Sequence, residues 1–340
     1  MATNETVRIV QRVKTDIDNY EATVQALHAF IGVTIWEDGQ FTSDSHHALG
    51  RRMETSGGNR FEPSTTVTPD AVIQQAHDFG YVVEGKASLS SDQEHWTDDV
   101  EQLHKYDDDL LGWWTADERI GNNDVVLLIR APLAADFVEY TERLDADRGW
   151  AFTRNMGYVE FNRIARVSPA LHLRLHEGVL TDDDIRNALQ KGQMVPLEGL
   201  VATFRARRFY DSPPPCEYLM EALWQGIFNE MKSEVAYDHG LKCWPLYVHV
   251  GNLTRELQKL YGSEGQAHRE VEYPRTAWVG RALEALVQIG LAQPGVAPGE
   301  YTILFRRILG DVIETFARHR SDDTDPAEPG YVQLELPTAQ

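Results

Sequence analysis

Two runs of β-favouring residues, TTVTPDAVIQQA and GYVVEGKAS, flank a short break at His77-Asp78. This pattern predicts a β-hairpin with its turn at the break, in which antiparallel pairing joins residues whose numbers sum to about 154–156. In this register Asp70 lies opposite Glu84 to Lys86. Because residues two apart on a strand point to the same face, Glu84 and Lys86 project together. The hairpin therefore predicts two carboxylates and one ammonium group at one end of a sheet.

Two carboxylates beside a lysine form a set of side chains with definite chemistry. Carboxylate oxygens are hard ligands that suit Mg²⁺ or Mn²⁺, and such cations also accept phosphate oxygens. The lysine can activate an attacking water and stabilise negative charge on a phosphate. A second Glu-x-Lys, at Glu230 and Lys232, lies in a helical pattern, where residues two apart do not share a face. An exposed ion pair on a surface hairpin is the alternative interpretation of Asp70, Glu84 and Lys86.

The order Pro69-Asp70, then Glu84-Gly85-Lys86, resembles the motif of the PD-(D/E)XK nuclease superfamily, the restriction-endonuclease-like proteins. Gly85 departs from the usual apolar middle residue, so we expect the strand to be locally looser there. The resemblance covers about residues 44–130 and implies DNA as the substrate and Mg²⁺ or Mn²⁺ as the cofactor.

Two flanking features add to the resemblance. Glu54 ends the stretch LGRRME, which we expect on a helix, and it resembles the acidic residue that many members carry before the core sheet. Gln102 and Tyr106 are one helical turn apart and resemble the Gln-x-x-x-Tyr motif of the RecB-type branch. The catalytic residues that the resemblance implies are Asp70, Glu84, Lys86, Gln102 and Tyr106. The metal ligands that it implies are Glu54, Asp70, Glu84 and the carbonyl of Gly85.

The order of elements along the first half predicts an α/β fold. A helix over 16–35, the hairpin, a helix over 92–114, the strand NDVVLLIRAP and a further helix suggest a mixed central sheet. The resemblance implies that this is a restriction-endonuclease-like core. The stretches GYVEFNRIARV and LEGLVATFRARRFY both read as strands. The domains that we predict are a nuclease-like core over 1–145, a β-rich extension and linker over 146–211, a winged-helix-like α+β domain over 212–320, and a disordered acidic tail over 321–340.

The C-terminal half follows the proline-rich linker Asp211–Pro215. Three helical patterns and a terminal β-wing resemble a winged-helix domain. Its predicted recognition helix, Pro274 to Ile289, has only Arg275 and Arg281 as basic residues. A structural or protein-binding role is therefore as good an interpretation of this domain as the recognition of DNA bases.

The negative charge of the chain limits its expected affinity for DNA. It has 32 basic and 53 acidic residues, a net charge of −21, and residues 1–150 alone carry 12 basic and 28 acidic residues. This charge opposes non-specific attraction to nucleic acid. We therefore expect weak intrinsic DNA binding and the help of a protein partner or a homo-oligomer. The candidate phosphate contacts are Arg163, Arg166, Arg205, Arg207 and Arg208, for which a solvated strand is an equally good interpretation.

Other protein classes are disfavoured by what the sequence lacks. It contains no apolar run of membrane-spanning length, no signal peptide and only two cysteines, which predicts a cytoplasmic protein without membrane contact. It has no phosphate-binding glycine loop and no HExxH, GxSxG or CxxC motif. The prediction is a metal-dependent DNA endonuclease or exonuclease of restriction, repair or anti-phage defence. The alternative is a non-catalytic winged-helix adaptor or regulator with a degenerate nuclease fold. The presence of all three residues Asp70, Glu84 and Lys86 favours the enzyme.

Overall fold

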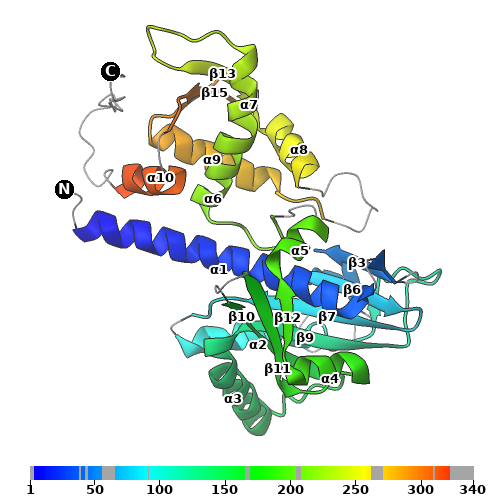
Figure 1. Ribbon diagram of the computed structural model, residues 1–340. Helices are drawn as coiled ribbons and strands as arrows, with labels where there is room; N and C mark the ends of the chain where they lie inside the picture. The colour runs from blue at the N-terminus through cyan, green and yellow to red at the C-terminus, as the bar shows by residue number, and fades with distance from the viewer. Residues whose placement is uncertain are drawn as a thin grey trace. The chain divides into compact units, whose positions relative to one another are not determined.

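The computed structural model describes residues 4–37, 40–42, 45–55, 66–90, 92–164, 169–203, 208–261, 271–308 and 311–321. Its contacts divide the chain into two units (Figure 1). The sheet unit comprises Asn19–Ser212 and Tyr261–Tyr273. The terminal unit comprises Met1–Asp18, Pro213–Leu260 and Pro274–Gln340. Most of the predicted tail, from residue 322 on, lies outside the residues that the structure describes.

A seven-stranded mixed sheet forms the centre of the sheet unit, in the order β12-β11-β10-β9-β7-β6-β3. The central strand β9 runs parallel to both of its neighbours, β7 and β10, and the other pairs are antiparallel. The α/β class with a mixed sheet is therefore confirmed. The strands are β3 (His46–Leu49), β6 (Ala71–Ala76), β7 (Phe79–Lys86), β9 (Asn122–Arg130), β10 (Met156–Ile164), β11 (Ala170–Gly178) and β12 (Gln193–Pro196). Strands β10 to β12 come from the predicted β-rich extension and belong to this same sheet.

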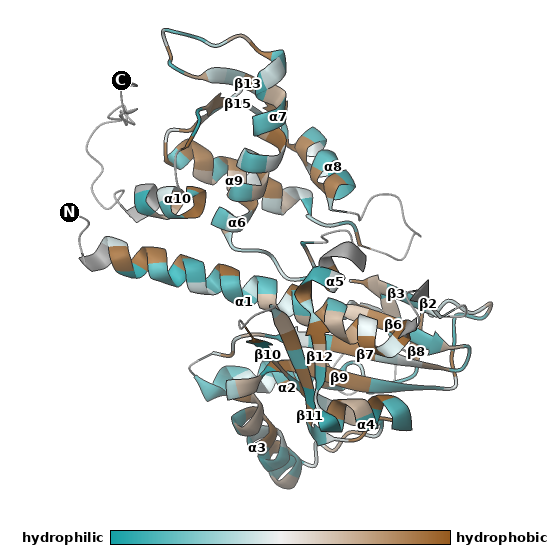
Figure 2. Ribbon diagram, in the orientation of Figure 1, coloured by the Kyte–Doolittle hydropathy of each residue, from teal (hydrophilic) through white to brown (hydrophobic). Residues whose placement is uncertain are grey.

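Helices cover both faces of this sheet, whose middle strands are strongly apolar (Figure 2). Helix α1 (Asn4–Ile35) packs on one face, where Phe30 contacts Tyr81 edge-on with ring centroids 5.6 Å apart. Helices α2 (Trp96–His104) and α3 (Ala131–Arg148) pack on the other face, against residues such as Val82 and Leu127. Each of these two helices connects a pair of parallel strands, β7 to β9 and β9 to β10. Continuous apolar strands are typical of sheets buried on both faces.

Several sequence-based assignments are wrong because strand pairing overrides local propensity. The expected helix ending at Glu54 is replaced by β3, which pairs with β6, and by β4 (Met53–Thr55). Strand β4 lies between β5 (Thr66–Val67) and β8 (Leu110–Leu111) in a separate sheet. The stretch that begins at Leu197 forms helix α5 (Leu197–Thr203) instead of a strand. The helix expected over 92–114 is shorter, with the turn η1 (Gln93–His95) before α2 and β8 after it.

The remaining elements of the sheet unit are short or peripheral. They are the strands β1 (Trp36–Glu37) and β2 (Gln40–Phe41), which pair with each other, and helix α4 (Asp183–Lys191). Asp182 caps α4, since its side chain accepts hydrogen bonds from the backbone N–H groups of Asp184 and Ile185. No helix in the described part of the chain has both the length and the apolar character that a membrane crossing requires.

The terminal unit contains helices and a three-stranded antiparallel sheet in the order β13-β15-β14. Trp224, Phe305 and Phe316 are buried together, with the Trp224 ring 4.9 Å from Phe305 and 5.7 Å from Phe316. In chain order its elements are α6 (Cys216–Glu221), the π-helix η2 (Ala222–Phe228), α7 (Asn229–Met231), η3 (Lys232–Glu234), β13 (Trp244–His249), α8 (Val250–Leu260), α9 (Thr276–Gln288), β14 (Ala292–Pro294), β15 (Glu300–Phe305) and α10 (Val312–Ser321).

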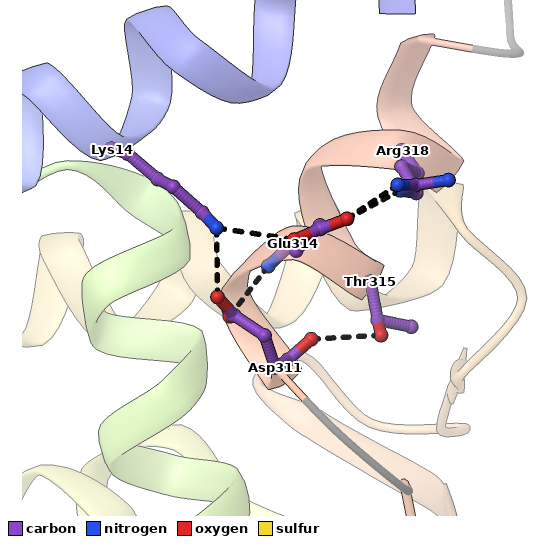
Figure 3. Close-up of polar contacts among 5 residues, drawn as sticks. All are labelled: Lys14, Asp311, Glu314, Thr315 and Arg318. Carbon is purple, nitrogen blue, oxygen red and sulfur yellow. Dashed lines mark hydrogen bonds and ion pairs between the residues drawn. The ribbon is translucent and has the colours of Figure 1, made fainter. Parts of the chain in front are cut away.

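The first part of α1 belongs to the terminal unit and is tied to α10 by ion pairs (Figure 3). Lys14 Nζ lies 2.8 Å from Asp311 Oδ2 and 3.1 Å from Glu314 Oε2. Asp311 also caps α10, because its Oδ1 accepts the N–H of Glu314 at 2.9 Å. These hydrogen bonds raise the pKa of Lys14. The ion pairs are partly exposed, so salt screens them and they add little to stability.

Candidate active site

The β6–β7 hairpin forms in the predicted register. Ala71 pairs with Val83 and Ile73 pairs with Tyr81, while a bulge near the turn absorbs one residue between Gln74 and Ala76. Asp70 lies one step before β6 and so comes opposite Glu84. The prediction of the hairpin and of its register is confirmed.

Asp70 is buried at the start of β6, with 3% of its surface exposed. The backbone N–H of Gly85 donates to its Oδ2 at 2.8 Å, and no described residue donates to its Oδ1. Burial raises the pKa of Asp70 well above its ordinary value, and the negative charge of Glu84 raises it further. A buried carboxylate with one unpaired oxygen is a group that a bound cation would stabilise.

Glu84 is held by two side chains from the segment of α2 and the turn after it. The Tyr106 hydroxyl donates to Glu84 Oε2 at 3.0 Å, and Gln102 Nε2 donates to the same hydroxyl at 2.5 Å. Gln102 and Tyr106 therefore point the same way, as their spacing predicts. Burial raises the pKa of Glu84, against the opposing effects of the Lys86 charge and the Tyr106 hydrogen bond. Burial and the charge of Glu84 also raise the pKa of Tyr106, so Tyr106 acts as a neutral hydrogen-bond donor.

Lys86 completes the group at the end of β7. Its Nζ lies 3.6 Å from Glu84 Oε1 and 2.8 Å from Asp99 Oδ1. Burial acts to lower the pKa of Lys86, but the negative charges of Glu84 and Asp99 outweigh it, and the net shift is upward. Lys86 therefore carries a proton at neutral pH and acts as a fixed positive charge. Three-quarters of its side chain is shielded from solvent, so this charge is screened less than an exposed one.

Asp99 is a member of this group that sequence reasoning missed. It lies in the first turn of α2, three residues before Gln102 and seven before Tyr106. Residues at positions i, i+3 and i+7 share one face of a helix, and this spacing is the signal that would have found it. Asp99 fixes the direction of the Lys86 ammonium group.

Gly85 lies on β7 where α1 packs closely against the strand. A Cβ atom at Gly85 would lie 2.6 Å from Thr23 Cγ2 of α1, well inside van der Waals contact. Gly85 is buried and pairs with Leu128 of β9. The expectation of a looser strand is therefore wrong: the absence of a side chain allows tight packing of a helix on the strand. A role for the Gly85 carbonyl as a metal ligand stays a prediction.

Glu54 lies on strand β4 and not on the predicted helix. Its strand β4 pairs Glu54 with Thr66 and Leu111 in the separate three-stranded sheet. The structure gives no hydrogen bond or ion pair between Glu54 and either carboxyl group of the hairpin, all of whose contacts are accounted for among the described residues. The helix predicted for Glu54 is therefore wrong, while its role as a metal ligand stays a prediction.

The predicted arginine patch is placed only in part. Arg163 on β10 donates to Gln25 Oε1 at 2.9 Å and lies 3.6 Å from Glu21, so it is engaged by α1. Arg208 lies 5.3 Å from the centroid of the Tyr261 ring. Arg166, Arg205 and Arg207 lie outside the described residues.

The residues at the hairpin fit a divalent cation of the Mg²⁺ type. Among the residues that the structure describes, no three side chains of His, Cys, Asp and Glu form a metal-binding cluster. Mg²⁺ does not need such a cluster, because it is usually held by one or two carboxylates and keeps several of its waters. Asp70 and Glu84 supply two buried carboxylates, and no described residue donates a hydrogen bond to Oδ1 of Asp70. The donor set therefore suits Mg²⁺ or Mn²⁺ and lacks the nitrogen and sulfur ligands that favour zinc.

The variant Tyr106→Phe tests the role of the Tyr106 hydroxyl. Phenylalanine keeps the ring in the core but removes the hydrogen bond to Glu84. We expect metal affinity or metal-dependent activity to fall about tenfold, as it does when a group that orients a metal ligand is lost. Titration with Mn²⁺ measures the effect. The Tyr140→Phe variant is the control, because the Tyr140 hydroxyl lies 2.6 Å from that of Thr97 and makes no hydrogen bond to Asp70 or Glu84. Equal affinities in all three proteins would contradict the assignment.

No family model matches this chain, and neither a curated protein nor a solved structure matches it.

Proposed function

We propose that this protein is a metal-dependent nuclease that hydrolyses phosphodiester bonds of DNA, with a restriction-endonuclease-like core. The observation that supports it best is the convergence of two buried carboxyl groups and a protonated lysine at one end of the β6–β7 hairpin. An exposed surface ion pair, the alternative interpretation, does not account for their burial or for the contacts of Tyr106 and Asp99. Cleavage of DNA by the full-length protein in Mg²⁺ or Mn²⁺ tests the proposal.

In this proposal each side chain has a distinct task. Asp70 and Glu84 would hold the cation, together with the carbonyl of Gly85. When bound, the cation polarises a phosphate oxygen and makes a water more acidic. Lys86 stabilises the additional negative charge that the phosphate acquires in the transition state. Gln102 and Tyr106 orient Glu84 so that its Oε1 faces Lys86.

The reaction itself is a hydrolysis. The oxygen of a water forms a bond to phosphorus, and one P–O bond to a sugar breaks. The attacking water loses a proton to solvent, and the departing sugar oxygen gains one. Because Lys86 is already protonated, we assign it the stabilisation of charge on the phosphate and not the removal of the first proton.

The terminal unit supports a winged-helix-like assignment, since its chain order is helix, strand, two helices and a β-hairpin. Its helix α9 contains Arg281 as its one basic residue, and Arg275 precedes it with its guanidinium 5.4 Å from the Trp278 ring. Because this helix has so few basic residues, it is better suited to bind a protein than to bind the phosphates of DNA. This feature is what favours the second candidate function, a non-catalytic adaptor, and within the nuclease proposal it suggests a protein partner or a second copy of the chain.

The biological role of this activity is proposed from the family resemblance. Restriction, repair or anti-phage defence in the cytoplasm would each use a DNA-cleaving enzyme of this kind. Cys216 and Cys243 form no disulfide in the structure, which is compatible with a reducing compartment.

The response of thermal stability to Mn²⁺ and pH gives a test that does not need a substrate. The pKa values of Asp70 and Glu84 are raised on folding, so between the unfolded and folded values the native state binds more protons than the unfolded state. Stability from this pair is therefore present at low pH and lost as pH rises through that window. Mn²⁺ binds the ionised pair, so its stabilising effect should grow with pH.

We expect Mn²⁺ at about 100 times its Kd to add about 2.7 kcal/mol to the unfolding free energy near pH 8. At about 2–4 °C per kcal/mol, this is a rise of about 5–10 °C in Tm. The rise should be much smaller near pH 5. The double variant Asp70→Asn, Glu84→Gln is the control and should show no rise at either pH. An equal rise at both pH values, or an unchanged rise in the double variant, would contradict the metal site.

A further inference from the structure

We propose that His46 and Trp114 form a surface on which an unpaired DNA base stacks, so that the protein binds single-stranded DNA in preference to duplex. This inference rests on the proposed function, because it names the form of DNA that the enzyme would take. His46 lies on β3 and Trp114 lies in the turn after β8. Neither residue belongs to the candidate active site.

Three planar groups are stacked beside β3, the edge strand of the seven-stranded sheet. The guanidinium carbon of Arg51 lies over the Trp114 ring, 3.8 Å from its centroid. The rings of His46 and Trp114 are nearly parallel, with an interplanar angle of 18° and centroids 5.5 Å apart. Arg51 is 5% exposed, Trp114 is half-buried and His46 is exposed. The stacked groups therefore extend from a buried guanidinium to an imidazole at the surface.

Each member of the stack is held by the backbone or by a buried side chain. Arg51 Nε donates to the carbonyl oxygen of Gly112 at 2.5 Å. The backbone N–H of Trp114 donates to Gln74 Oε1 at 2.8 Å, and His46 pairs with the same Gln74 between β3 and β6. Gln74 is only 2% exposed. Because the rings are positioned before a ligand arrives, binding costs less conformational entropy than it would on a mobile loop.

The stack lies on the same sheet face as the candidate active site. Residues two apart on a strand share a face, so Asp70 and Gln74 project to the same side, and His46 projects with its partner Gln74. Four residues of a strand span about 13 Å. One strand of DNA advances about 3.4 Å per nucleotide, so a few nucleotides would connect a phosphate at Asp70 with a base at His46.

The charge of the chain favours a base over a phosphate as the group that binds here. The net charge of −21 opposes the approach of phosphates. Stacking on a flat ring does not depend on net charge and accepts any sequence, because every base has a π face. Inside a duplex each base is already paired and stacked between its neighbours. An unpaired base is therefore the one that can stack on His46.

Binding of short labelled oligonucleotides by the full-length protein in EDTA tests the inference without cleavage. The probes are an oligothymidine strand, an abasic strand of the same length and a duplex of the same length. Fluorescence anisotropy gives the affinity for each probe. We expect the wild type to bind oligothymidine about fivefold or more tightly than the abasic strand, because the two differ only in their bases. The duplex should also bind more weakly than oligothymidine.

Three variants assign this preference to the stack. His46→Ala should lower the affinity for oligothymidine about fivefold or more and leave the affinity for the abasic strand unchanged. His46→Phe restores a flat ring and should bind as the wild type does. His239→Ala is the matched control, because His239 is also exposed and lies 5.1 Å from the Tyr237 ring but belongs to the terminal unit. It should bind as the wild type does. Circular dichroism verifies that each variant is folded.

The outcomes separate this inference from the proposed function. Wild-type affinity of His46→Ala for oligothymidine would overturn it and leave the stack as a contact for a protein. Equal affinity of the wild type for oligothymidine and the abasic strand, no binding of either, or an equal loss in His46→Phe would also overturn it. None of these results bears on cleavage in Mg²⁺. Binding that depends on His46, without cleavage in Mg²⁺ or Mn²⁺, would overturn the nuclease and leave the base-binding surface standing.

Discussion

Replacement of Lys86 by Met is expected to slow metal-dependent DNA cleavage by about 10²–10³-fold, the usual cost of removing one group that stabilises a transition state. Met keeps most of the apolar stem of the side chain and removes only the charge. The charge is well placed, because Glu84 and Asp99 hold it at the end of β7 with most of the side chain shielded from solvent. The partner carboxyl of Asp99 is 23% exposed, so water can solvate it in the variant. We therefore expect a folded protein with little activity.

The matched control is Lys232→Met. Lys232 belongs to the other Glu-x-Lys of the chain and lies in the terminal unit, where it contacts Asn229 and the rings of Trp244 and Phe305. This variant should cleave at the rate of the wild type, measured under single-turnover conditions at saturating Mg²⁺. Equal rates for Lys86→Met and Lys232→Met would show that Lys86 has no part in catalysis.

Gly85→Ala is expected to lower the free energy of unfolding by about 1–3 kcal/mol, as overpacking of a core commonly does. The added methyl would lie 2.6 Å from Thr23 Cγ2 in the present packing, so α1 or β7 must shift. This shift also disturbs the N–H of Gly85 that holds Asp70, and activity should fall with stability. Urea unfolding measures the loss.

A second substitution identifies the cause of that loss. Thr23→Ser removes the methyl group that the new Cβ would meet and keeps the hydroxyl that donates to the carbonyl of Asn19. If this contact is responsible, the double variant Gly85→Ala, Thr23→Ser should be more stable than the sum of the two single effects predicts. We expect the difference in unfolding free energy to be about 0.5–3 kcal/mol. Gly32→Ala is the control, since a Cβ at that position of α1 meets nothing within 4 Å. A neutral Gly85→Ala, or strictly additive effects, would contradict the tight packing of α1 on β7.

The parts of the site that depend on local spacing were predictable from the sequence. The turn at His77-Asp78 sets the register that places Asp70 opposite Glu84, and one helical turn sets the relation of Gln102 to Tyr106. In both cases the residues are joined by a short stretch of regular structure, so the chain itself fixes their separation.

The parts that depend on distant segments were not predictable. Glu54 lies on a strand because β3 and β4 pair with partners elsewhere in the chain, and no local pattern records that pairing. The need for a glycine at position 85 arises only when α1 packs on the sheet.

The acidity of the chain and the proposed site are related. A net charge of −21 opposes the approach of DNA, and the carboxyl groups around Lys86 add to this repulsion locally. A divalent cation bound by Asp70 and Glu84 would offset the local excess of negative charge where the phosphate must lie. Metal binding would thus favour the approach of the scissile phosphate as well as its hydrolysis.

The most direct test of the account is a cleavage assay with the full-length protein in excess over DNA. Supercoiled plasmid, linear duplex and single-stranded DNA are each incubated with Mg²⁺, with Mn²⁺ or with EDTA, for the wild type and for Asp70→Asn. The account predicts that the wild type cleaves at least one of these substrates when the cation is present, and that EDTA or Asp70→Asn abolishes cleavage. Intact DNA under every condition, cleavage that persists in EDTA, or wild-type rates in Asp70→Asn would contradict it.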